Sequence, residues 1–115
     1  MNNILEKIVS DKKNSVEKYK KFFSIGDLKK KISKYGNYLN FKDELKKNKI
    51  SVVAEIKKAS PSAGTIVENY DPKLIAKQYL VSGADCLSVL TEENYFKGKL
   101  ADIYQIKKEV KLPVL

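Results

Sequence analysis

The chain has 115 residues, enough for one small domain, and 43% of them are hydrophobic, enough for a core. Its net charge of +9 is concentrated near the start, because residues 1–49 contain 14 Lys against 6 acidic residues. All 23 basic residues are Lys, and the lack of Arg argues against base readout and bidentate binding of phosphates. We therefore expect no nucleic-acid partner.

Cysteine and histidine usage excludes two further classes of protein. Cys86 is the single cysteine and histidine is absent, so neither a disulfide framework nor a His/Cys zinc site can form. A lone thiol suits the reducing cytoplasm. The sequence has neither the apolar region of a signal peptide nor a run long enough to span a membrane, so no membrane partner is expected.

Three helices are predicted in the Lys-rich first part of the chain. Residues 3–22 have an amphipathic pattern, with apolar side chains on one stripe and charges elsewhere. Residues 24–35 have a weaker helical pattern, which Gly36 would end. Residues 41–47 predict a short helix with Asn40 as its N-cap.

From Ile50 onward, strands alternate with helices. The β-branched run ISVVAEI is typical of a parallel strand that is buried on both faces. The helix after it has Asp71 as N-cap and Pro72 at its first position. The predicted elements, in order, are a strand at 50–56, a loop at 58–64, a helix at 71–83, a strand at 84–91, a helix at 97–110 and a third strand opening at 112–115.

This alternation predicts an α/β fold with a parallel sheet. A parallel strand needs cover on both faces and a neighbour at each edge, so we expect the chain to be the front part of a longer fold. Three strands cannot close a barrel. We therefore expect the isolated chain to be unstable, to aggregate, or to need a complementing second segment.

Glu55 and Lys57 are opposite charges two residues apart near the end of the first strand. This spacing directs both side chains to one face, with Ile56 and Ala54 on the other. In a (β/α) barrel, inward-pointing charges at the carboxyl end of a strand lie at the mouth, where such enzymes place their chemistry. Burial there would make each charge depend on the other. The spacing alone also fits an exposed pair on an edge strand.

Three stretches of the sequence resemble the indole-3-glycerol-phosphate synthase family. They are VVAEIKKASPSAGTI, YDPKLIAKQYLVSGADCLSVLTEENYFKGKL and KLPVL, of which the AEIKKASPS and LSVLTEENYFKG blocks are the most specific. The N-terminal ILEKIVSDKK is similar to the family's leading helix. The resemblance implies a TIM (β/α)8 barrel, with residues 1–49 as a helical extension and residues 50–115 as the first part of the barrel, truncated in strand three.

The resemblance also implies a reaction. The family is a carboxy-lyase of tryptophan biosynthesis that closes the indole ring of the phosphosugar 1-(2-carboxyphenylamino)-1-deoxyribulose 5-phosphate, with loss of carbon dioxide and water. It needs neither cofactor nor metal. The family's second lysine, its main general acid, and its phosphate-binding loops have no counterpart within these residues, so we expect the chain alone to be inactive.

Five residues match the family's site. By resemblance, Lys57 would hold the substrate carboxylate and assist proton transfer, and Glu55 would orient it. Ser60 would donate a hydrogen bond near the anthranilate ring, and Pro61 would shape the wall against that ring. Phe96 would form part of the apolar pocket for the ring. Without the resemblance, Phe96 fits a core residue equally well and the Ser60–Pro61 pair fits a plain turn.

Two other functions remain open on the sequence. One is another phosphosugar barrel enzyme such as phosphoribosylanthranilate isomerase, which the Glu-x-Lys pair disfavours. The other is a basic helical module that binds nucleic acid or a partner protein, which salt-dependent binding to duplex DNA would reveal.

Overall fold

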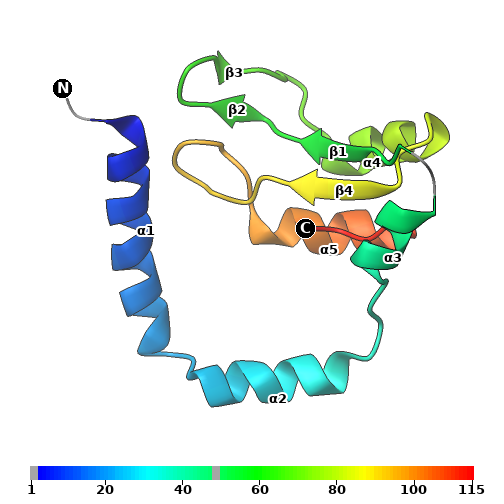
Figure 1. Cartoon of the computed structure of the whole chain (residues 1–115). Helices are drawn as coiled ribbons and strands as arrows, with labels where there is room; N and C mark the ends of the chain where they lie inside the picture. Colours follow the sequence, from blue (N-terminus) through cyan, green and yellow to red (C-terminus); the bar gives the residue numbers. More distant parts are fainter. Residues whose placement is uncertain (1–2, 48–49) are drawn as a thin grey trace. The chain divides into compact units, whose positions relative to one another are not determined.

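The computed structural model describes residues 3–47 and 50–115, which contain five helices and four short strands (Figure 1). In chain order these elements are α1 (Ile4–Lys20), α2 (Ile25–Tyr35), α3 (Phe41–Lys46), β1 (Val53–Ile56), β2 (Ala59–Ser60), β3 (Gly64–Thr65), α4 (Pro72–Val81), β4 (Cys86–Val89) and α5 (Leu100–Glu109). The chain divides into two compact units, one ending at Tyr38 and the other spanning Leu39–Leu115.

Capping side chains decide where α1 and α2 begin. The Asn3 side chain accepts the backbone N–H of Leu5 at 3.0 Å. Ser24 and Asp27 form a reciprocal capping box, with N–H to side-chain distances of 3.0 and 3.2 Å. Hydrogen bonds from Ser24 lower the pKa of the Asp27 carboxyl. Gly36 ends α2 in the left-handed region, at φ 69°, so the second predicted helix and its glycine stop are confirmed.

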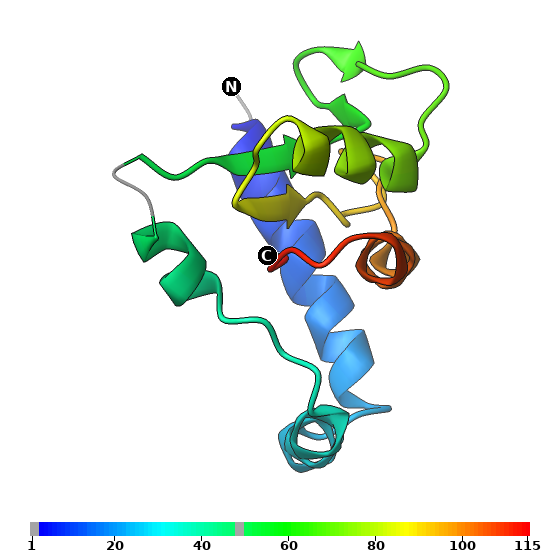
Figure 2. The ribbon, with the colours of Figure 1, turned by 90° about the vertical axis from the view of Figure 1, so that its right-hand side faces the viewer.

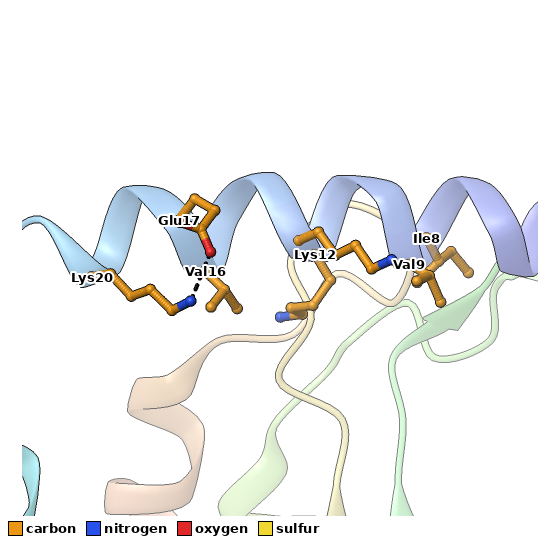
Figure 3. Close-up of a pocket in the computed structure, with 7 residues that line it drawn as sticks. Ile8, Val9, Lys12, Val16, Glu17 and Lys20 are labelled. Carbon is orange, nitrogen blue, oxygen red and sulfur yellow. Dashed lines mark hydrogen bonds and ion pairs between the residues drawn. The ribbon is translucent and has the colours of Figure 1, made fainter. Parts of the chain in front are cut away.

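The apolar stripes of the first two helices are open to solvent within their own unit. Neither α1 nor α2 contains a buried residue. On α1, Ile8, Val9 and Val16 form the apolar stripe, with Lys12 and Lys20 beside it (Figure 3). The amphipathic pattern predicted for this segment is therefore confirmed, although its apolar side remains 41% exposed at Val16.

The core of the second unit lies between a parallel sheet and two helices. β1 pairs in parallel with β4, and the register places Val53 opposite Cys86 and Ile56 opposite Val89. Helices α4 and α5 pack against each other, and α4 also packs against β1 (Figure 2). The buried core cluster consists of Ile56, Ala76, Leu87, Val89, Ile106, Val110 and Leu112.

The last residues of the chain add a third parallel segment beside β4. Val114 pairs with Leu87 in a parallel bridge. The backbone N–H of Leu87 donates to Pro113 O at 2.9 Å, and the N–H of Leu115 donates to Leu87 O at 2.9 Å. The parallel α/β alternation predicted from the sequence is therefore confirmed. In the described residues the sheet is open. The prediction that β1 is buried on both faces is wrong, because Val53 is 42% exposed.

A short hairpin replaces the loop that was predicted at residues 58–64. β2 and β3 are antiparallel, with Ala59 opposite Thr65 and Ser60 opposite Gly64. Gly64 takes a left-handed conformation, at φ 65°, which glycine adopts in this turn without the backbone strain that a residue with a side chain would have. Paired strands of two residues are too short to leave an alternating pattern in the sequence, which is why the prediction missed them.

Helix α3 belongs to the second unit and lies against β4. Its first residue, Phe41, offers a carbonyl oxygen 3.9 Å from Cys86 Sγ. The Asn40 side chain accepts the N–H of Asp43 at 3.0 Å, so the predicted N-cap is confirmed. The predicted domain boundary after residue 49 stays a prediction, and residues 48–49 lie outside the described residues.

Shortening a core side chain of β1 tests this architecture. Ile56 is fully buried, so Ile56→Ala should lower the free energy of unfolding by about 2–5 kcal/mol in a urea titration of the 115-residue chain joined to the complementing segment that it is expected to need. Ile50 is 82% exposed, so Ile50→Ala should change it by no more than about 0.5 kcal/mol. Equal effects of the two changes would show that Ile56 does not lie in the core.

Candidate active site

Glu55 and Lys57 lie on the face of β1 that points away from the core. Ile56, between them in sequence, is fully buried in the core cluster, and Ala54 packs against that cluster. Glu55 Oε1 lies 3.1 Å from Lys57 Nζ, so the two side chains form an ion pair. The shared face predicted from their spacing is confirmed. Their expected burial is wrong, because Lys57 is 34% and Glu55 48% exposed on a face that no helix of the core covers.

The carboxyl end of β1 is held from two sides. The Tyr79 hydroxyl, on α4, donates to Glu55 O at 2.8 Å. The backbone N–H of Leu90, just after β4, donates to Ile56 O at 3.1 Å. These bonds fix the backbone from which the ion pair projects.

Ser60 and Pro61 lie in the hairpin that follows the ion pair. The Ser60 hydroxyl oxygen accepts the backbone N–H of Ala63 at 3.1 Å and lies 3.4 Å from Ser62 Oγ. Pro61 is exposed at the turn. Ser60 thus has a structural task in closing the turn, and its predicted hydrogen bond to a substrate ring stays a prediction.

Phe96 lies in the loop between β4 and α5, and it is half-buried. Its backbone N–H donates to the Glu92 carboxylate at 3.1 Å. Glu92 is a residue of this loop that the sequence does not predict as part of the site. No sequence pattern marks this carboxylate, because the path of the loop brings the N–H groups to it.

The hairpin and the Phe96 loop leave the same edge of the sheet, beyond the carboxyl ends of β1 and β4 (Figure 1). Lys97 Nζ donates to Thr65 Oγ1 at 3.2 Å and so links the two loops. The hydrogen bonds and ion pairs of the described residues join Glu55 to Lys57, but join neither of them to Ser60 or Phe96. These predicted residues therefore share one edge of the sheet, but no hydrogen bond or ion pair of the described residues connects the Glu55–Lys57 pair to the other two.

The chemistry available at this edge is ionic and aromatic. The ammonium of a partly exposed lysine side chain can bind a carboxylate and move a proton, and an aromatic ring can cover a flat apolar ligand. Within residues 3–47 and 50–115, no group of three His, Cys, Asp or Glu side chains is placed to hold a metal ion. Over the same ranges, no helix is long and apolar enough to cross a membrane.

Parallel strands joined by helices, with polar side chains at their carboxyl edge, define a parallel α/β protein of the kind that places its site at this edge. A family model described as "Indole-3-glycerol phosphate synthase" matches residues 5–115. The chain belongs to this family.

Curated relatives with this name agree with the family match. The chain is 45% identical to the indole-3-glycerol phosphate synthase of Acaryochloris marina, over 98% of this chain and 38% of that protein. It is 43% identical to that of Prochlorococcus marinus subsp. pastoris, over 98% of this chain and 39% of the relative. For Acetivibrio thermocellus the identity is 44%, over 97% and 44% of the two chains. The chain thus spans less than half of the length of these relatives.

One tyrosine packed against the core cluster has an unusual environment. Tyr70 precedes α4, and its hydroxyl is a buried polar atom without a hydrogen-bond partner among the described residues. Burial, with a smaller contribution from the Asp102 carboxylate, raises the pKa of Tyr70 to about 12. The Lys58 ammonium lies 5.9 Å from the centre of its ring.

An alkaline titration tests this environment. Because the pKa is raised, the folded chain still holds the phenol proton at a pH where the unfolded chain has lost it. Tyr70 should therefore lower the free energy of unfolding as the pH rises from 10 to about 12, and it should have no such effect below pH 10. Ultraviolet absorbance should show a tyrosine step near pH 12, and Tyr70→Phe should remove that step. Tyr104→Phe, at a 64% exposed side chain, is the control and should leave it in place.

Proposed function

We propose that this chain supplies the N-terminal part of an indole-3-glycerol phosphate synthase. The complete enzyme would close the indole ring of 1-(2-carboxyphenylamino)-1-deoxyribulose 5-phosphate and release carbon dioxide and water, as a carboxy-lyase of tryptophan biosynthesis. One observation carries the proposal: the Glu55–Lys57 ion pair projects from the carboxyl end of β1, away from the core, in a chain of this family.

Lys57 would bind the substrate carboxylate and assist proton transfer. Its side chain is 34% exposed and therefore open to an anionic ligand, while Glu55 Oε1 lies 3.1 Å from its ammonium nitrogen. An ammonium fixed before the substrate arrives can stabilise negative charge that develops in the transition state without further reorganisation. Glu55 acts in this proposal by orienting Lys57.

The two loops would enclose the anthranilate ring of the substrate. Phe96 is half-buried and so offers part of its ring as an apolar contact, and Pro61 is exposed at the tip of the hairpin. Ser60 would use its hydroxyl proton as a donor, because its oxygen already accepts the N–H of Ala63. The Lys97–Thr65 bond supports this arrangement by holding the two loops together.

The complete fold in this proposal is a TIM (β/α)8 barrel. Residues 1–49 would form its helical extension and residues 50–115 its first strands and helices, consistent with three parallel segments whose helices pack together. The remaining strands would come from a complementing C-terminal segment of the barrel. Such an enzyme would work in the cytoplasm, where the free thiol of Cys86 stays reduced.

A chimera tests the function. This chain replaces the matched N-terminal part of the Acaryochloris marina synthase, and indole fluorescence follows turnover of the carboxyphenylamino-deoxyribulose phosphate. The chimera should turn over, and Lys57→Ala in it should lower kcat by about 10²–10⁴-fold, the usual contribution of a group that transfers a proton.

Lys58→Ala is the matched control, because it removes a neighbouring ammonium that lies over the Tyr70 ring. This change should leave kcat within about threefold of the unmodified chimera, as expected for a residue outside the site. A folded chimera without turnover, or one that Lys57→Ala and Lys58→Ala affect alike, would contradict the proposed function.

A further inference from the structure

The loop between β4 and α5 is organised around one carboxylate. Glu92 Oε1 accepts the backbone N–H of Asn94 at 2.8 Å. Glu92 Oε2 accepts the N–H of Tyr95 at 2.6 Å and that of Phe96 at 3.1 Å. Three consecutive backbone donors therefore converge on one ionised side chain, and hydrogen bonds to a charged acceptor are about twice as strong as neutral ones.

The far end of the same loop is closed by backbone contacts. Gly98 donates its N–H to Glu92 O at 2.9 Å, so residues 92–98 form a closed loop. A Cβ at Gly98 would lie 1.9 Å from Leu90 O, which excludes every other residue type without a backbone shift. Lys97, just before this glycine, takes a left-handed conformation at φ 54°. The backbone geometry of the loop is thus fixed at both ends.

From this geometry we infer that Glu92 is a positioning residue of the site: its carboxylate holds the backbone of Phe96 and so fixes the Phe96 ring where the substrate's aromatic ring binds. The inference rests on the proposed function, which assigns the ring to Phe96. A ring held before binding loses less conformational entropy when the ligand arrives. Glu92 acts only through Phe96 and touches no reacting atom.

Nuclear magnetic resonance of this chain within the chimera described above tests this inference without turnover, because the 115-residue chain alone is expected to need a complementing segment. In the unmodified chain, the amides of Asn94, Tyr95 and Phe96 should be protected from hydrogen exchange, although Asn94 is exposed. Glu92→Gln puts an amide NH₂ in place of one acceptor oxygen, so exchange at these amides should become at least about tenfold faster. Gly98→Ala should open the loop from its other end and have the same effect.

Anthranilate, added as the probe, separates positioning from a general loss of structure. In the unmodified chain it should shift the resonances of both the Phe96 ring and the Lys57 ammonium group. Glu92→Gln should abolish the shifts at Phe96 and leave those at Lys57, whose ion pair lies on β1. Glu93→Gln, at an exposed neighbour with the same change in charge, should behave like the unmodified chain.

Three results would overturn the inference. The first is fast exchange of the three amides in the unmodified chain, a measurement that needs no variant to fold. The second is an unchanged Phe96 response in Glu92→Gln. The third is an unmodified chain in which anthranilate does not move the Phe96 resonances. All three results leave the proposed function standing, because turnover by the chimera tests that function separately.

Discussion

Alternation of side chains along β1 is the constraint on which the rest of the structure depends. Ile56 enters the core, and Glu55 and Lys57 therefore emerge together on the opposite face. A slip of one residue in the pairing with β4 would bury both charges under α4 and α5 and expose Ile56. Because both charges would then have to leave water, at a cost of several kcal/mol per ion before their mutual attraction is counted, the core residues also fix the position of the ion pair.

The parallel direction of the strands adds the second level of organisation. Both loops that follow β1 and β4 leave the sheet at the same edge, so residues about forty positions apart in the sequence come to the same edge of the sheet. Local hydrogen bonds then shape each loop by itself. The Ser60 hydroxyl oxygen closes the hairpin by accepting the N–H of Ala63. The Glu92 carboxylate accepts the N–H groups of residues 94–96, and Lys97 joins the two loops by its hydrogen bond to Thr65.

Much of this could be predicted from the sequence, because periodicity and caps are local signals. The Glu55–Lys57 geometry follows from strand alternation alone, and the N-cap at Asp71 accepts the N–H groups of Lys73 and Leu74 as its position before Pro72 predicts. The family resemblance is confirmed by the match over residues 5–115.

The hairpin and the role of Glu92 could not be predicted in the same way. A two-residue ladder leaves no periodic pattern in the sequence, and a carboxylate that binds three N–H groups depends on the path of the loop rather than on spacing. The exposure of Glu55 also escaped prediction, because it depends on what covers the outer face of β1, and that is not a property of the strand itself.

The central claim is that β1 directs its apolar residues to the helices and its charged pair to the other face, in parallel register with β4. Nuclear Overhauser contacts between protons of the two strands test it most directly. The account predicts backbone contacts from Glu55 to Ser88 in parallel register, together with contacts from the Ile56 side chain to Ala76 or Ile106. A register shifted by one residue, or contacts from Lys57 to those helix residues, would contradict it.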